Sequence, residues 1–199
     1  MTNWKELSGD KSWEGQLQPL KQNLCKTLIH YGRRVQAIYE SLDDGNPKYE
    51  KDELFSQVRL GGFYTVNNYF YATSKIDFLP KVGGAWSGRA WIGYMVVATD
   101  EGKKEIGRRD ILICWKGTMT PAEWIKVSSS INPQLLPFWE KTALEILAYK
   151  GFLSIYMSAK DQVLDAIKEL MNQYKGEEIN VTVSGHRLGA SLAIMNSTD

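Results

Sequence analysis

The residues of this chain that could do chemistry lie in the stretch VTVSGHRLGASLAIM, from position 181 to 195. A β-branched run ends at Gly185 and an apolar run follows Gly189, which predicts a strand that turns sharply into a helix. Glycines two residues before and after a central residue are typical of a nucleophile elbow, where a serine sits at the start of a helix. Here the central residue is Arg187. Two other interpretations stay open: a plain tight turn, and an anion-binding turn in which Arg187 holds a phosphate.

The neighbours of Arg187 do not replace the missing serine. His186 stands just before the central position, and we expect it to make structural hydrogen bonds rather than to act as a catalytic base. Ser184 lies back in the predicted strand. Ser191 falls one turn into the predicted helix, away from the amide groups that would stabilise an oxyanion.

The bulk composition predicts one domain with a substantial core. The chain has 199 residues, of which 43% are hydrophobic and 24% are charged, which is ordinary for a globular protein. The formal net charge of +1 gives no electrostatic support for binding a nucleic acid. The sequence has no window near ~18 consecutive apolar residues, so we expect no transmembrane helix.

Cysteines and histidines are too few for a metal centre or a disulfide framework. Cys25 and Cys114 both lie in apolar surroundings, which predicts buried thiols in a reducing compartment. The two histidines, His30 and His186, are not paired with other ligands at metal-binding spacing, so no metal site is expected. The polar N-terminal segment lacks the apolar core of a secretory signal, which favours a cytoplasmic location.

Periodicity predicts an α/β domain around the elbow. Amphipathic spacing indicates one or two helices in residues 17–39 and a helix over 160–175. The best strands are 90–100 and 111–115, with a hairpin connection expected between them, and 179–184 is a third strand leading into the elbow. Residues 66–73 are ambiguous between helix and strand, and 43–53 are a loop by composition.

Several segments resemble the class 3 lipases, in particular their plant-type cytosolic phospholipase A1 branch. GHRLGASLA resembles the elbow GHSLG(G/A)xLA of that family. The similarity extends to WKELSGDKSWEG, YFYATSKID, WIGYMVVATDEG, GRRDILICWKGT and GFLSIYMS, and so covers nearly the whole chain. The resemblance implies an α/β-hydrolase fold, with residues 1–199 as a single incomplete domain. Within it, region 1–80 would be mainly helical and region 85–199 would form the sheet.

The same resemblance implies an activity and a set of site residues. The activity is hydrolysis of the sn-1 acyl ester of glycerophospholipids or related acyl lipids, without metal or organic cofactor, on a substrate held at a membrane surface. Arg187 occupies the nucleophile position, and the backbone N–H of Leu188 is one oxyanion donor. Thr118 is expected to be the second donor rather than a simple turn residue. Trp124 falls in the lid or acyl-contact segment, where a packed structural tryptophan is an equal alternative.

The chain departs from the family in two ways. A guanidinium is always protonated and has no lone pair to offer as a nucleophile. The aspartate and histidine of the hydrolase triad follow the elbow in sequence, and no histidine follows it here before Asp199. We therefore expect a truncated α/β-hydrolase fold without catalytic activity, marginally stable, with the strand 179–184 as an exposed apolar edge.

Three interpretations remain after these departures. The first is an inactive phospholipase A1-type acyl hydrolase. The second is a non-catalytic lipid-binding or regulatory protein, in which Arg187 holds a phosphate headgroup or the exposed edge pairs with an intact relative. The third is an incomplete sequence, which comes from a gene fragment or from a misread codon at position 187. The sequence does not indicate the acyl-chain preference, the headgroup preference or the oligomeric state.

Overall fold

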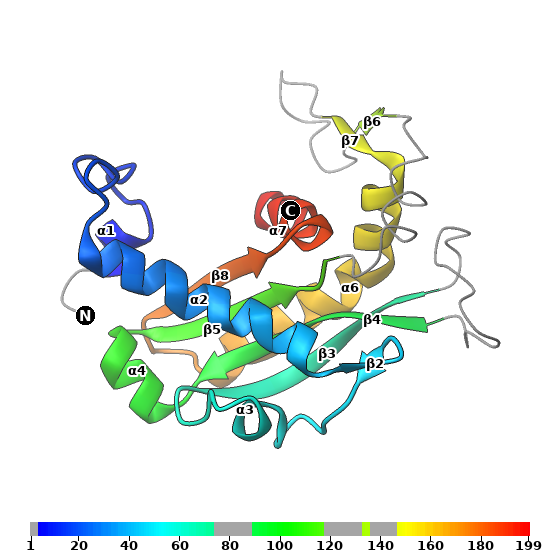
Figure 1. Cartoon of the computed structure of the whole chain (residues 1–199), viewed down its shortest axis with the longest axis horizontal. Coiled ribbons are helices and arrows are strands. Elements are labelled where there is room, and N and C mark those ends of the chain that lie inside the picture. The colour runs from blue at the N-terminus through cyan, green and yellow to red at the C-terminus, as the bar shows by residue number, and fades with distance from the viewer. Residues whose placement is uncertain (1–3, 74–88, 118–132, 136–146) are drawn as a thin grey trace.

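A four-stranded mixed sheet forms the centre of the computed structural model, which describes residues 4–73, 89–117, 133–135 and 147–199. The strands follow the order β3-β4-β5-β8, with β3 Tyr64–Thr73, β4 Arg89–Ala98, β5 Arg109–Trp115 and β8 Ile179–Gly185. The pairs β3–β4 and β4–β5 are antiparallel, whereas β8 runs parallel to β5. Figure 1 shows the sheet crossing the middle of the molecule.

The central strand β5 explains why the sheet forms where it does. All seven of its residues are buried, as expected for a strand that is covered on both faces. Its parallel partner β8 is reached through the long helix α6 (Lys150–Gln173), because parallel neighbours need a crossover connection. The register pairs Trp115 with Gly185, so both strands end together at the edge where the elbow lies.

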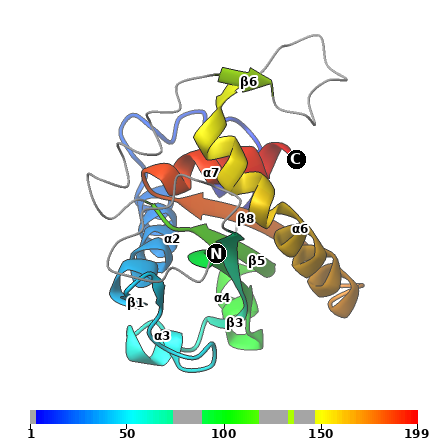
Figure 2. The same cartoon turned by 90° about the vertical axis from the view of Figure 1, so that its right-hand side faces the viewer.

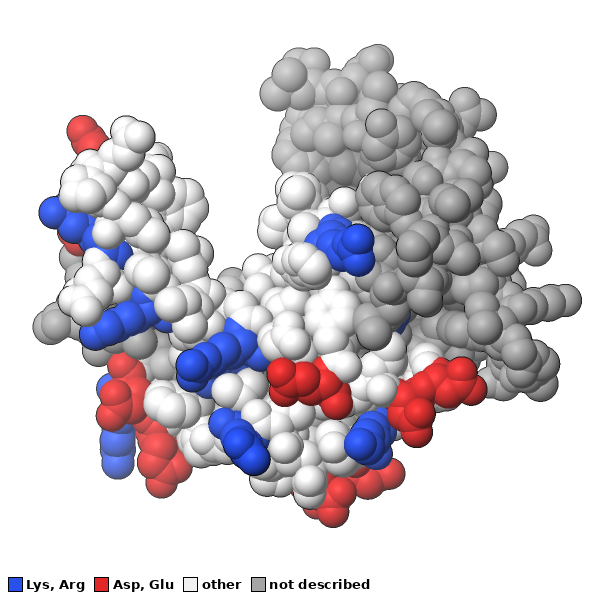
Figure 3. All heavy atoms as spheres, viewed as in Figure 1, with Lys and Arg blue, Asp and Glu red and all other residues white. Residues whose placement is uncertain are grey.

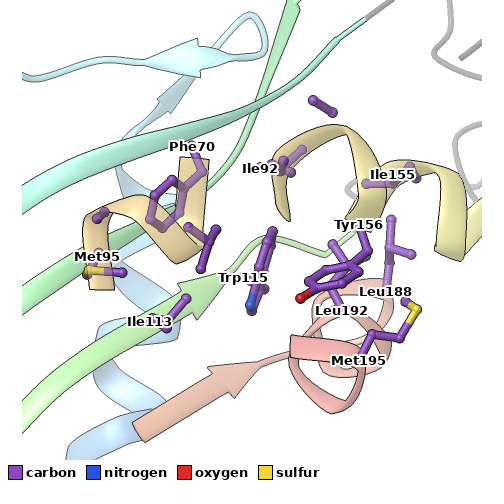
Figure 4. Close-up of a cluster of buried hydrophobic side chains, with 14 of the residues drawn as sticks. Phe70, Ile92, Met95, Ile113, Trp115, Ile155, Tyr156, Leu188, Leu192 and Met195 are labelled. Atoms are coloured by element: carbon purple, nitrogen blue, oxygen red, sulfur yellow. The ribbon is translucent and has the colours of Figure 1, made fainter. Parts of the chain in front are cut away.

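Helices cover the two faces of the sheet. Helix α2 (Gln22–Glu40) crosses one face, while α6 and α7 (Leu188–Thr198) lie on the opposite face (Figures 1 and 2). Each face has its own cluster of buried apolar side chains. The cluster beneath α6 and α7 is centred on Trp115, which stacks on Phe70 and meets Tyr156 edge-on (Figure 4).

The remaining elements are short. Helices α1 (Trp4–Leu7) and α3 (Leu54–Gln57) lie in the N-terminal third, and β1 (Leu42–Asp43) pairs with β2 (Asn46–Pro47). Strands β6 (Pro133–Leu135) and β7 (Leu147–Tyr149) form a separate two-stranded sheet. Within the described ranges, no helix has both the length and the apolar character needed to cross a bilayer. On the face in Figure 3, acidic and basic side chains are interspersed.

One connection contains an element that the sequence prediction did not include. Strands β4 and β5 pair antiparallel, as the expected hairpin connection requires, but the segment between them contains helix α4 (Asp100–Ile106). Thr99 caps this helix, because its hydroxyl accepts a hydrogen bond from the Gly102 N–H at 3.0 Å. Asp100 and Glu101 in the first turn add favourable interactions with the helix dipole. The polar composition of the segment therefore reflects a helix within the hairpin connection.

Other elements differ from their prediction in type or in the residues at which they begin. The ambiguous residues 66–73 lie in β3, so part of the region expected to be mainly helical belongs to the central sheet. The expected loop 43–53 contains the β1–β2 pair, and α6 begins ten residues earlier than the predicted helix, at Lys150. Strand β8 is an edge of the sheet within the described residues, as expected.

Candidate functional site

The turn between β8 and α7 has the backbone geometry of a nucleophile elbow. Strand β8 ends at Gly185 and helix α7 begins at Leu188. Between them, Arg187 has φ 57° and ψ −122°, a combination that L-residues rarely adopt. The plain tight turn is therefore the poorer description, because the strained residue stands at the central position of the elbow.

Glycine is required on both sides of Arg187 because the chain packs against itself there. A Cβ atom on Gly185 would lie 2.1 Å from the carbonyl oxygen of Gly189. A Cβ atom on Gly189 would lie 2.3 Å from the carbonyl oxygen of Trp115 at the end of β5. Both distances are far inside van der Waals contact, so the two glycines permit the close crossing of β5, β8 and α7.

The first turn of α7 is bonded back to the elbow. The N–H of Gly189 donates to the His186 carbonyl and that of Ala190 donates to the Arg187 carbonyl, each at 3.0 Å. Leu188 is the first residue of the helix and its side chain is buried. The first N–H groups of a helix carry partial positive charge. That the Leu188 N–H donates to an oxyanion stays a prediction.

Two predicted site residues, Thr118 and Trp124, lie outside the described residues. Lys116 and Gly117 follow β5, and Gly117 is the last described residue before Thr118. Gly117 lies against the elbow, because a Cβ atom there would be 2.3 Å from the His186 carbonyl oxygen. The chain therefore passes the elbow immediately before the predicted second oxyanion donor.

His186 contacts a side chain from another element, and its structural rather than catalytic role stays a prediction. Its Nδ1 lies 3.1 Å from the hydroxyl of Tyr39, near the C-terminal end of α2. The two rings meet edge-on, with centroids 5.8 Å apart. The Tyr39 hydroxyl also accepts a hydrogen bond from the Gly117 N–H at 3.1 Å. No local pattern in the sequence pointed to Tyr39, which lies 147 positions before His186.

The two serines near the elbow lie away from the central position. Ser184 is in β8 and pairs with Cys114 in the register of the sheet. Ser191 is the fourth residue of α7. Both serines lie in the elements that the sequence predicted for them, and that neither acts as a nucleophile stays a prediction.

Side chains of β5 and α6 form hydrogen bonds with α7 and with Asp199, which follows it. The indole Nε1 of Trp115 donates to the Asn196 side-chain oxygen at 3.1 Å, and both groups are buried. The Tyr156 hydroxyl donates to Asp199 at 2.8 Å, and Lys160 contacts the same carboxylate at 2.6 Å. Figure 4 shows Trp115 and Tyr156 lying between α6 and α7, with Tyr156 beside Leu188 and Leu192. These bonds fix the helix whose first turn forms the site.

A buried carboxylate on the opposite face of the sheet was not predicted. Asp110 in β5 is 0% exposed. Its Oδ2 accepts hydrogen bonds from Tyr64 at 2.7 Å and Tyr31 at 3.2 Å, and its Oδ1 accepts from Thr182 at 2.7 Å and Asn180 at 3.2 Å. The available signal was an aspartate directly before the apolar run ILICW, since a buried charge requires partners.

Two basic residues complete this cluster. Arg108 lies 3.6 Å from Asp110 and donates to the Tyr31 hydroxyl at 2.8 Å. The Nε2 of His30 lies 3.1 Å from the Tyr64 hydroxyl. Burial, and secondly the charge of Arg34, lower the pKa of His30 to about 4. Burial and the neighbouring Asp110 raise the pKa of Tyr31 to about 12. We refer to Asp110, Tyr31, Tyr64, Asn180, Thr182, Arg108 and His30 as the Asp110 cluster.

An open cavity of about 740 Å³ lies between the N-terminal segment and β8. Leu17, Leu24 and Leu28 form part of its apolar wall, and Thr182 and Ser184 face it from β8. It adjoins the strand that leads into the elbow, but neither Arg187 nor Leu188 lines it.

The described residues offer no cluster of histidine, cysteine, aspartate and glutamate that could hold a metal ion. Cys25 and Cys114 are both free thiols; Cys114 is buried as predicted, whereas Cys25 is only partly buried. Burial raises the pKa of the Cys114 thiol to about 12, so this sulfur stays protonated at neutral pH and is unsuited to act as a nucleophile.

Comparison with known families and proteins identifies relatives of the chain. Residues 112–199 match the family model described as lipase (class 3). The chain is 34% identical to phospholipase A1-II 6 of Oryza sativa subsp. japonica over 98% of its own length and 54% of that protein. It is 34% identical to phospholipase A1-IIgamma of Arabidopsis thaliana, with the same two coverages. It is 36% identical to phospholipase A1-II 2 of Oryza sativa subsp. indica, over 100% of the chain and 57% of that protein. The chain thus spans about half the length of these relatives.

Solved lipase structures share the fold. The Rhizomucor miehei lipase in its propeptide complex superposes with a TM-score of 0.59 at 17% identity, covering 89% of this chain and 46% of that one. The Lip2 lipase of Yarrowia lipolytica gives a TM-score of 0.56 at 16% identity, covering 89% and 54%. These likenesses confirm an α/β-hydrolase fold.

Proposed function

Since residues 112–199 of this chain belong to the class 3 lipase family, we propose that it is part of a phospholipase A1-type acyl hydrolase. Its substrate class would be glycerophospholipids, with cleavage at the sn-1 acyl ester at a membrane surface. The observation that carries the proposal is the elbow itself, where a strained residue at φ 57° stands at the first turn of α7 between two obligatory glycines. The 34–36% identity to plant proteins named phospholipase A1 supports the choice of ester.

We further propose that the Arg187 form does not hydrolyse esters at this elbow. The guanidinium stays protonated and offers no lone pair for attack on a carbonyl carbon. The surrounding backbone keeps the elbow conformation and the helix amide groups. The site would therefore retain the geometry for an oxyanion while lacking the atom that forms the acyl-enzyme.

The test restores the nucleophile with Arg187→Ser and uses a fluorophosphonate probe. In this reaction a serine oxygen displaces fluoride from phosphorus, and the hydroxyl proton passes to solvent. We expect no covalent labelling of the unchanged chain. We expect slow labelling of Arg187→Ser, because hydrolases that lack triad residues still react about 10³–10⁴-fold faster than the uncatalysed reaction in water, through the oxyanion hole and binding. Adding Ser191→Ala should leave the labelling intact, which assigns it to position 187.

Two outcomes would contradict the proposal. Labelling of Arg187→Ser no faster than that of the same variant unfolded in urea would mean that the elbow gives no oxyanion stabilisation, and would contradict the proposal. Release of fatty acid from phosphatidylcholine vesicles by the unchanged chain would contradict the loss of activity caused by Arg187.

A second candidate function is non-catalytic binding of a lipid headgroup. It is favoured by the exposed position of Arg187 beside the first turn of α7, where a phosphate would meet a cation and helix amide groups. Co-sedimentation with anionic phospholipid vesicles tests it. Weaker binding by Arg187→Ala would support headgroup binding, and equal binding by both forms would exclude it.

A further inference from the structure

Three segments that are distant in sequence meet at the hydroxyl group of Tyr39. It comes from the C-terminal end of α2, accepts the Gly117 N–H at 3.1 Å, and lies 3.1 Å from Nδ1 of His186. A Cβ atom on Gly117 would be 2.6 Å from this hydroxyl oxygen and 3.2 Å from the Arg187 Cβ. Tyr39 therefore occupies the space between the end of β5 and the elbow.

We propose that Tyr39 is a positioning residue, which sets the separation between the elbow and Gly117 at the end of β5. The inference rests on the proposed function, because this separation matters for catalysis only where the elbow supplies an oxyanion donor. That donor is the Leu188 N–H, on which Tyr39 acts through its contacts with His186 and Gly117.

One hydrogen-bond role at Tyr39 is fixed, and the other is part of the proposal. The Gly117 N–H can only donate, so the phenolic oxygen accepts from it. We assign the phenol's own proton to the contact with Nδ1 of His186, which would place the imidazole proton on Nε2. In this assignment Tyr39 fixes the His186 tautomer as well as the distance between Gly117 and the elbow.

Helix α2 is held firmly enough to act as a fixed support. Tyr31, two turns before Tyr39 on the same helix, donates to the buried Asp110 in β5. The Tyr94 hydroxyl of β4 donates to the Arg34 carbonyl of α2. Buried apolar side chains of α2, including Val35 and Ile38, pack on the same face of the sheet. Displacing Tyr39 would therefore mean displacing a helix that is bonded to two central strands.

The test compares Tyr39→Phe with a matched control, Tyr69→Phe. Both changes remove one phenolic oxygen, but the Tyr69 hydroxyl donates to the Tyr49 carbonyl, away from the elbow. In the unchanged Arg187 background, the readouts are the ¹⁵N shifts of the His186 ring at pH 8 and the hydrogen exchange of the Gly117 amide. We expect Tyr39→Phe to remove the preference for the Nε2-protonated tautomer and to speed exchange of the Gly117 amide about tenfold or more. Tyr69→Phe should change neither.

A second measurement tests whether Tyr39 affects the reactivity of a serine at position 187. In the Arg187→Ser background, Tyr39→Phe should slow fluorophosphonate labelling about tenfold, and Tyr69→Phe should leave the rate unchanged. Equal labelling with Tyr39 or Phe at this position would overturn the positioning role. So would unaltered His186 tautomer and Gly117 exchange in Tyr39→Phe. If both spectroscopic signals move but Arg187→Ser is never labelled, the proposed function fails while the support of the elbow by Tyr39 stands.

Discussion

At the scale of single residues, Arg187 has the strained backbone conformation of a nucleophile, although its guanidinium cannot act as one. A non-glycine residue in such a region costs about 1–3 kcal/mol. In a working elbow this strain aims a nucleophile away from the sheet. Here it persists because Gly185 and Gly189 bring three segments into contact and leave the turn no other path. The conformation is a property of the elbow, independent of the residue at its centre.

Replacing Arg187 with glycine should therefore stabilise the chain. Glycine adopts φ 57° without the steric cost of a Cβ, while the freer unfolded chain offsets part of the gain. We expect Arg187→Gly to raise the free energy of unfolding by about 1 kcal/mol in urea titrations. The matched control is Arg33→Gly at an exposed position of α2, which should lower it by about 1 kcal/mol. A loss of stability in both variants would show that position 187 is not strained.

At the scale of elements, local patterns predicted what depends on local packing. Apolar periodicity predicted α6, because this helix packs one apolar face on the sheet. β-Branched runs predicted β4, β5 and β8, because these strands carry apolar side chains that helices cover. The same patterns did not decide whether β3 is a helix or a strand, since its apolar and aromatic residues are compatible with both. They missed α4, although its capping residue Thr99 and two acids in its first turn were present in the sequence. Asp110 was missed because its partners come from three other elements.

The Asp110 cluster makes stability depend on pH through His30. The unfolded chain binds a proton on this residue near pH 6.5, whereas in the folded chain its pKa is about 4. Between these values the unfolded state binds more protons, so stability is complete above pH 6.5 and falls as the pH is lowered toward 4. Burial is the largest cause. Arg34 and Arg108 also lower the pKa, and Asp110 partly opposes them.

Replacing His30 with glutamine should remove this part of the pH dependence. The full shift would correspond to about 3 kcal/mol, and because His30 keeps some contact with solvent we expect about 1–2 kcal/mol. The measurement is urea unfolding at pH 4.5 and pH 7. The matched control is His186→Gln at the chain's other histidine, which contacts Tyr39 and not a member of the Asp110 cluster in the hydrogen bond described above. If His30→Gln loses as much stability between the two pH values as the unchanged chain, the interpretation of His30 is wrong.

At the scale of the whole molecule, the site depends on contacts that no local pattern describes. The elbow motif itself was predicted, because two glycines, a β-branched strand and an apolar helix follow one another in sequence. Tyr39 and the end of β5 reach the elbow only because α2 lies on one face of the sheet and β5 is the neighbour of β8. The order of strands and the packing of helices therefore decide which residues surround Arg187.

The same architecture leaves β8 as an edge of the sheet within the described residues. Val181 on this strand is 39% exposed, and Leu17 and Leu28 beside it are 58% and 56% exposed. An apolar sheet edge is prone to pair with another chain. We expect the 199-residue chain to self-associate in sedimentation velocity runs at concentrations of about 10–100 μM, in the range where exposed edges drive association. Val181→Lys should shift it toward the monomer, because a charged edge residue opposes pairing.

The control for this experiment is Ile194→Lys on α7. Ile194 is 66% exposed and lies outside the sheet, so the variant adds the same charge without altering the edge. If association is driven by β8, Ile194→Lys associates like the unchanged chain and Val181→Lys does not. Equal suppression by both variants would mean that added charge alone keeps the chain apart. A monomeric unchanged chain across the whole concentration range would show that β8 is protected in solution despite its place in the sheet.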